Sequence, residues 1–188
     1  MRTQAERTLA GRAGFVSVAG SAEATTLAPG SVDLVTAAQA FHWFALDPFC
    51  AELARILRPS GQAALIWNDR DLDGTPFLRE YETILRAHCP GYEELQGKSA
   101  TPEKFDAVFG AGQWTRHTAP NEQRLGRSDL VTRVMSASYA PRAGSPEADA
   151  LANALTAAFD RNAEQTAAGP VIRIAYTTAV IGGAPLRA

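Results

Sequence analysis

The sequence predicts an α/β fold, in which apolar strands alternate with amphipathic helices. Two near-continuous apolar runs, Val32–Ala38 and Gln62–Trp67, suggest strands that helices cover on both faces, as in a parallel sheet. Between them, Pro48–Arg58 has the spacing of an amphipathic helix. This order of strand, helix and strand is typical of an α/β unit.

The residues before Val32 predict one helix, one short strand and one loop. Arg2–Ala10 is rich in helix formers and is followed by glycines that can end a helix. Phe15–Val18 alternates apolar and polar residues, as a short strand does. Gly20–Gly30 has the composition of a loop, with room for a helical turn at Ala22–Leu27. We expect the strands near Phe15, Val32 and Gln62 to be parallel.

The helix Pro48–Arg58 has a clear start, face and end. Asp47 can cap the free amide groups, and proline fits the first helical position. The sequence Pro59-Ser60-Gly61 is expected to end the helix. Its apolar face contains Phe49, Leu53, Ile56 and Leu57.

After Asn68 the pattern becomes mainly helical and ends in an antiparallel strand pair. Three cap-and-proline pairs, at Thr75, Thr101 and Ser145, each predict a helix start. The expected helices are Pro76–Cys89, Pro102–Phe109, Asp129–Ser138 with Ser128 as its cap, and Pro146–Ala168. The expected strands are Trp114–Leu125, broken near Pro120, and Val171–Ile181, which is rich in β-branched residues.

The composition is that of a soluble globular protein of one domain. The chain has 188 residues, of which 46% are hydrophobic and 20% charged. A formal net charge of -2 argues against a nucleic-acid-binding surface. No apolar run is long enough to cross a membrane, and the start of the chain lacks the apolar core of a signal peptide. Cys50 and Cys89 fit no disulfide framework, so we expect a cytoplasmic protein.

Three short segments together carry a family resemblance. They are Gly20-Ser21-Ala22-Glu23-Ala24, Ser31-Val32-Asp33-Leu34-Val35 and Gln39-Ala40-Phe41-His42-Trp43. In this order and spacing the chain resembles a class I S-adenosylmethionine-dependent methyltransferase of the methyltransferase type 11 kind. The resemblance implies a Rossmann-like fold, S-adenosyl-L-methionine as cofactor and methyl transfer to a small-molecule acceptor.

One part of the family pattern is missing from the printed sequence. The family begins with a glycine-rich strand–turn–helix and an acidic residue that ends the next strand, and neither is present here. We therefore expect a single partial domain over 1–188 that lacks the first two strands. Residues 1–70 would form the second part of the cofactor-binding half, and 71–188 the helical cover and C-terminal strands. Because the glycine turn and the acidic residue hold much of the cofactor, we expect weak cofactor binding.

The resemblance places the cofactor against two loops. Gly20, Ser21, Ala22 and Glu23 would lie against the adenine, where a side chain and a backbone amide can bind the base edge. The alternative is a solvated turn with a helix-starting glutamate. Ala38, Gln39 and Ala40 would sit beside the sulfonium, where small residues allow a close backbone approach. No catalytic residue is assigned.

The resemblance also places four residues in the acceptor pocket. They are Trp43, Asn68, Arg70 and Tyr139, and Arg70 can bind a substrate carboxylate. Alternatively Trp43 and Tyr139 are core residues, and Arg70 is a surface arginine paired with Asp69 or Asp71. His42 has the chemistry of a general base, but packing under the next helix is the preferred interpretation.

Two other functions compete with methyl transfer. The sequence from Asp69 to Glu80 fits the calcium-loop pattern D-x-D-x-D-G-x5-E, yet a strand precedes it where an EF-hand has a helix. The other alternative is a non-catalytic remnant or interaction domain of the same fold. Because the first two strands of the family pattern are missing, an open edge at Val32–Ala38 would leave apolar residues in water, so we expect self-association there. The sequence suggests no metal site other than this loop.

Overall fold

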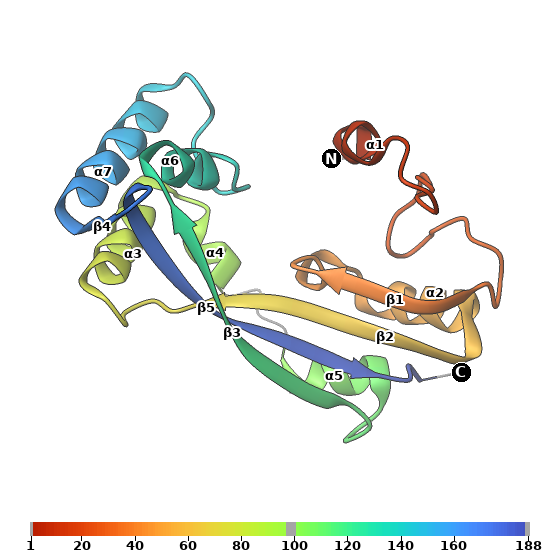
Figure 1. Cartoon of the computed structure of the whole chain (residues 1–188). Helices are drawn as coiled ribbons and strands as arrows, with labels where there is room; N and C mark the ends of the chain where they lie inside the picture. Colours follow the sequence, from red (N-terminus) through yellow and green to blue (C-terminus); the bar gives the residue numbers. More distant parts are fainter. Residues whose placement is uncertain (1, 97–100, 187–188) are drawn as a thin grey trace. The chain divides into compact units, whose positions relative to one another are not determined.

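The computed structural model describes residues 2–96 and 101–186, and they form two compact units (Figure 1). Unit 1 consists of the described residues of Met1–Leu65, Thr101–Thr115 and Ile181–Ala188. Unit 2 consists of the described residues of Ile66–Ala100 and Arg116–Val180. The assignment of both units to a single domain stays a prediction.

Unit 1 is built around a strand–helix–strand step. β1 (Val32–Ala38) is followed by the 3-10 helix η1 (Phe41–Trp43), by α2 (Leu46–Ile56) and by the start of β2 (Leu57–Arg70). β1 and β2 are neighbours in the sheet and run in the same direction (Figure 1). The amides of Gly30 and Ser31, just before β1, donate to the carbonyls of Arg55 and Ile56, just before β2. The parallel α/β step is thereby confirmed.

The amphipathic face predicted for α2 forms the core of unit 1. Phe49, Leu53 and Ile56 are at most 3% exposed, and α2 packs against α5 (Pro102–Phe109). Because these positions recur at helical spacing, one side of α2 can enter the core while the other faces water.

Two local predictions for unit 1 are wrong. Phe15–Val18 is not a strand, since residues 15–20 have no regular structure and Val16 is 77% exposed. Alternation alone does not make a strand without a neighbouring strand to bond it. Ala22–Leu27 holds no helical turn, because the amides and carbonyls of Ser21 and Ala24 bond each other in a tight turn. The first helix, α1 (Arg2–Leu9), is confirmed.

The boundaries of α2 and β2 also differ from those expected. α2 begins at Leu46 after Ala45, so Asp47 lies inside its first turn and is not the cap. β2 follows directly at Leu57, so Pro59-Ser60-Gly61 lies within the strand's bounds and does not separate it from the helix. The strand predicted at Gln62–Trp67 is present as the middle of β2.

Unit 2 contains the helices that follow β2. They are α3 (Pro76–His88), α4 (Tyr92–Gln96), α6 (Arg127–Met135) and α7 (Pro146–Asn162). The caps predicted at Thr75 and Ser145 are confirmed, since their hydroxyls accept from the amides of Leu78 at 3.1 Å and Ala148 at 3.2 Å. α6 begins after Gly126, so the cap predicted at Ser128 is wrong.

α7 ends earlier than predicted because a hairpin follows it. β4 (Glu164–Thr166) pairs antiparallel with the start of β5 (Gly169–Gly183), and Thr166 faces Gly169 across the turn. Gly169 has a φ of +112°, which a residue with a side chain rarely adopts, and this allows the tight reversal. Residues 164–168 therefore belong to the hairpin, and the helix predicted to Ala168 stops at Asn162.

The C-terminal antiparallel strand pair is confirmed. The strand order is β1-β2-β5-β3, where β3 is Thr115–Leu125. In unit 2, Asn121 bonds Thr178 at 3.1 Å and Gln123 bonds Tyr176 at 3.2 Å, a register that only antiparallel strands give. β3 runs unbroken through Pro120, contrary to the predicted break. Proline is tolerated there because β3 is at the edge of the sheet.

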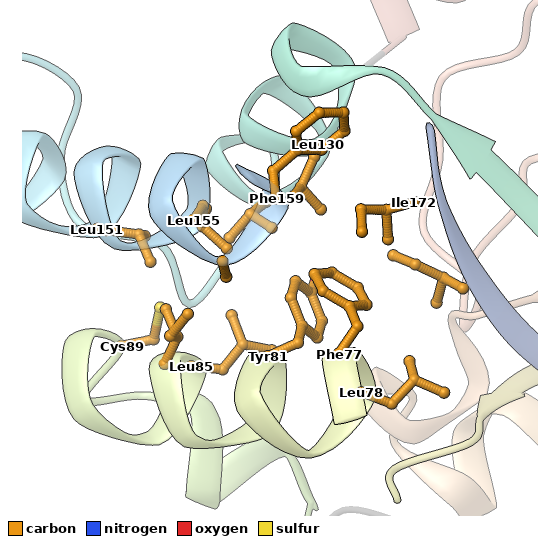
Figure 2. Close-up of a cluster of buried hydrophobic side chains, with 14 of the residues drawn as sticks. Phe77, Leu78, Tyr81, Leu85, Cys89, Leu130, Leu151, Leu155, Phe159 and Ile172 are labelled. Carbon is orange, nitrogen blue, oxygen red and sulfur yellow. The ribbon is translucent and has the colours of Figure 1, made fainter. Parts of the chain in front are cut away.

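Helices α3 and α7 meet across the core of unit 2 (Figure 2). α3 contributes Tyr81 and Leu85, and α7 contributes Leu155 and Phe159, all at most 2% exposed. Leu130 of α6 and Ile172 of β5 belong to the same cluster. In the described part of the chain, no helix is long and apolar enough to span a membrane.

The open strand edge expected at β1 is also observed. β1 stands at the end of the strand order, with β2 as its neighbour. Leu34 in the middle of β1 is 56% exposed. Self-association through this edge stays a prediction.

Candidate functional site

A pocket lies in unit 1 at the end of β1. Its volume is about 250 Å3, and most of its lining is apolar. Ala22 contributes from the loop before β1, and Ala38 and Ala40 contribute from the end of the strand. Phe49 and Leu53 of α2 form part of the opposite lining. Two segments that the sequence identified separately thus border one cavity.

Gln39 turns the chain away from β1 at the pocket. Its φ is +51°, in the left-handed region that few residues other than glycine adopt. Such backbone strain persists only where the surroundings enforce it, and it often occurs at ligand sites. Ala38 and Ala40, the small residues on either side of Gln39, both line the pocket.

Gly20 and Ser21 shape the other loop. A Cβ atom at Gly20 would lie 2.7 Å from the carbonyl oxygen of Ala24, so no other residue fits without a backbone shift. Ser21 is bonded to Ala24 through both backbone groups. The two residues therefore hold the turn that places Ala22 at the pocket.

Glu23 points its carboxylate at the start of α2. It accepts a hydrogen bond from the amide of Ala45 at 3.0 Å. This bond, with a second from Ser21 and one from its own amide, lowers the pKa of Glu23. The carboxylate thus bonds the loop that carries Glu23 to the residue just before α2.

Three polar residues that line the pocket were not predicted from the sequence: Thr25, Thr36 and Glu52. Glu52 is 7% exposed, and its carboxylate accepts from the amide of Thr25 at 2.8 Å and from its hydroxyl at 2.6 Å. The guanidinium of Arg55 donates twice to the same carboxylate, each time at 2.7 Å. Arg55, and then Thr25, lower the pKa of Glu52 to about 2. The available signal was a charged residue inside the apolar stripe of α2.

The aromatic segment after β1 separates into buried and exposed residues. Phe41 is 3% exposed and lies in the core. Trp43 is 53% exposed, which excludes the core alternative for it, and its ring stands 5.0 Å from that of His42. The pocket is bordered by Phe44, whose ring lies 4.8 Å from Phe49.

In unit 2, two predicted acceptor residues share one cluster. Arg70 donates through Nη2 to Glu82 at 2.7 Å and to the hydroxyl of Tyr92 at 2.5 Å. Tyr139 stands edge-on to Tyr92 at 5.2 Å. The alternative pairing of Arg70 with Asp69 or Asp71 is therefore wrong.

Asn68 has different neighbours. Its side-chain oxygen accepts from the hydroxyl of Thr178 at 2.6 Å and from Asn121 at 3.4 Å. It thus links β2 to β5 and β3 within unit 2.

Two acidic residues of the calcium pattern, Asp71 and Glu80, have other partners. Asp71 accepts from the amides of Asp73 and Gly74, at 3.3 and 3.0 Å. Glu80 bonds Arg161 and Asn162 of α7. Among the residues that the structure describes, no group of three or more His, Cys, Asp or Glu side chains is placed to hold a metal ion. The calcium alternative gains no support.

Comparison with known proteins identifies similar sequences. Residues 1–65 match the family model of a methyltransferase domain. An uncharacterised methyltransferase-like protein of Schizosaccharomyces pombe is 48% identical over 67 residues, which are 36% of this chain and 26% of that protein. An uncharacterised methyltransferase of Mycobacterium bovis is 35% identical over 127 residues, 66% of this chain and 47% of that protein. The chain thus spans less than half of the length of these relatives.

A solved structure is also similar. It is that of a protein from Anaeromyxobacter dehalogenans that has been proposed to be a type II methyltransferase. The sequences are 26% identical, the TM-score is 0.49, and the match covers 90% of this chain and 71% of that chain.

Proposed function

We propose that the chain belongs to the class I S-adenosylmethionine-dependent methyltransferases, on its match to a methyltransferase domain over residues 1–65, and that unit 1 binds the adenosyl part of S-adenosyl-L-methionine. The cofactor would serve methyl transfer to a small-molecule acceptor. The observation that supports this is the shared pocket of Ala22, Ala38 and Ala40. These residues come from the two loops for which the resemblance implies cofactor contacts.

The size and chemistry of the pocket fit one part of this cofactor. A volume of about 250 Å3 is below the range of roughly 300–1,000 Å3 that encloses most drug-sized ligands. It suits a flat base against the apolar surface of Phe49 and Leu53, with backbone groups near Ala22 and Gln39 for polar contacts. Because the pocket covers only part of the ligand, we expect weak binding.

The proposed roles follow from what each residue already does. Gly20 and Ser21 form the turn, Glu23 bonds it to Ala45 just before α2, and Ala22 lines the pocket. The carboxylate of Glu52 accepts hydrogen bonds from Thr25 and Arg55 and thereby holds Thr25 at the pocket. The pocket walls would orient the ligand and exclude water from one side of it.

Bound S-adenosylmethionine supplies an activated methyl group, so alignment with the acceptor can provide much of the rate. This requirement explains why no catalytic acid or base has to be assigned. On the acceptor side we retain Trp43 in unit 1 and Asn68, Arg70 and Tyr139 in unit 2 as candidates.

The test is the binding of S-adenosylhomocysteine to the purified chain by calorimetry and NMR. We expect a dissociation constant weaker than about 1 μM, with shifted signals from Ala22, Ala38 and Gln39. In Ala38→Leu the larger side chain should fill the pocket and abolish these shifts. Ala119→Leu, an exposed strand alanine in unit 2, is the matched control and should bind as the parent does.

A parent chain that shows no shifts at millimolar ligand would contradict the proposal. It would favour the alternative of a non-catalytic domain of the same fold. Micromolar or tighter binding would support the cofactor assignment but contradict the expectation of weak binding.

A further inference from the structure

The side chain of Arg70 is held rigidly in unit 2. It is 13% exposed, and Nη2 donates to both Glu82 and Tyr92. The guanidinium carbon stands 4.7 Å from the centre of the Tyr81 ring, at a distance typical of a cation–π contact. The hydroxyl of Tyr92 also donates to Glu82 at 2.7 Å. Three neighbours therefore fix the position and the plane of the guanidinium.

One nitrogen of this group has no acceptor. Nη1 of Arg70 is buried and makes no hydrogen bond to any residue that the structure describes. A buried charged donor without a partner is costly, and folded proteins rarely contain one without a reason. A guanidinium that is preorganised on one side and unsatisfied on the other has the geometry of a binding group.

The surroundings of Arg70 offer a second donor and excess positive charge. Tyr139 lies in the connection between α6 and α7, so its half-buried side chain can move without disrupting a helix. Arg70 and Arg133 both act electrostatically on Tyr139 and Tyr81. Glu82 pairs with both Arg70 and Arg86, and Glu93 pairs with Arg86. Arg133 donates at 3.3 Å to the neutral amide of Gln123, a contact that leaves its positive charge in place near Tyr139.

We propose that unit 2 binds a small monocarboxylate, with one carboxylate oxygen on Nη1 of Arg70 and the hydroxyl of Tyr139 as a second donor. One excess positive charge matches a carboxylate better than a phosphate dianion. The proposal rests on the proposed function in one respect, since the carboxylic acid would then be the methyl acceptor.

The test is a titration of the purified chain with propionate at constant ionic strength, followed by calorimetry and by tyrosine ring signals in NMR spectra. Arg70→Lys keeps a positive charge beside Glu82 but loses the second nitrogen, and we expect binding about tenfold weaker or worse. Arg86→Lys is the matched control. Arg86 bonds the same Glu82 but is 54% exposed, so this variant should bind propionate as the parent does.

Tyr139→Phe gives a second measurement that leaves Arg70 intact, should Arg70→Lys fail to fold. It keeps the ring against Tyr92 and removes the hydroxyl, so propionate binding should weaken. Unchanged binding in both variants, or equal binding of inorganic phosphate and propionate, would overturn the proposal. Because these readouts need no methyl donor, a failure here leaves the S-adenosylhomocysteine result in unit 1 unaffected, and the reverse also holds.

Discussion

Single residues at the two sites show how charge is used differently in the two units. The carboxylate of Glu52 accepts hydrogen bonds from Thr25 and Arg55, and it therefore links the loop before β1 to α2 at the pocket wall. In Arg70, Nη2 donates a hydrogen bond to Glu82, whereas Nη1 has no acceptor among the described residues. A charge that is fully satisfied stabilises a structure, whereas a half-satisfied one indicates a ligand.

The contact made by Glu52 predicts a pH dependence of stability. The pKa of Glu52 is lowered to about 2 in the folded chain. The ionised carboxylate therefore stabilises the folded chain fully above the usual pKa of a glutamate, and this stabilisation is lost as the pH falls through the pKa of the folded state. Glu52→Gln should therefore lower the unfolding temperature at pH 7 and flatten its dependence on pH between about 4.5 and 2. Thermal unfolding followed by circular dichroism measures this.

Thr25→Ser is the control for the same contact. It keeps the hydroxyl and the amide that Glu52 accepts from, so the pH dependence of the parent should persist. An identical pH profile in Glu52→Gln and the parent would show that the contact contributes nothing.

At the scale of elements, the sequence predicted helix starts better than helix ends. Thr75 and Ser145 correctly predicted the starts of α3 and α7, because a hydroxyl residue followed by proline is typical of the first turn of a helix. The end of α7 was missed because the pairing of Glu164 with Val171 depends on residues beyond the helix. Phe15–Val18 failed for the same reason, since its pattern cannot reveal that no strand lies beside it.

The interface between α3 and α7 predicts where unit 2 is most sensitive. Leu155 is fully buried between the two helices. Leu155→Ala should reduce the free energy of unfolding by about 2–5 kcal/mol, through lost contacts and a cavity. Asn153→Ala, on the exposed face of the same helix, should change it by less than about 0.5 kcal/mol. Urea denaturation measures both, and equal effects would contradict the assigned packing.

For the whole molecule, the sequence predicted the α/β class, the parallel step from β1 to β2 and the antiparallel end. Polarity and periodicity report these features directly. The pocket was predicted only in part. Ala22 and Ala38 lie in segments that carry the family resemblance, whereas Thr25 and Glu52 become pocket residues only when α2 packs against β1. Which of these residues contact a ligand stays a prediction.

The open edge of β1 predicts association between chains. Leu34 is 56% exposed on a terminal strand, and such edges pair with other strands. Leu34→Lys should therefore shift the chain towards monomer in sedimentation velocity experiments. Leu72→Lys, at a 38% exposed leucine in unit 2, is the control and should leave the distribution unchanged. A parent chain that is monomeric at all concentrations would contradict the prediction.

The two outer strands differ in what they can offer a neighbour. Pro120 in the middle of β3 has no N–H, so a strand added there would lack one rung of its ladder. A strand added along β1, which contains no proline, could bond at every position. Pairing between chains is therefore expected at β1 rather than at β3.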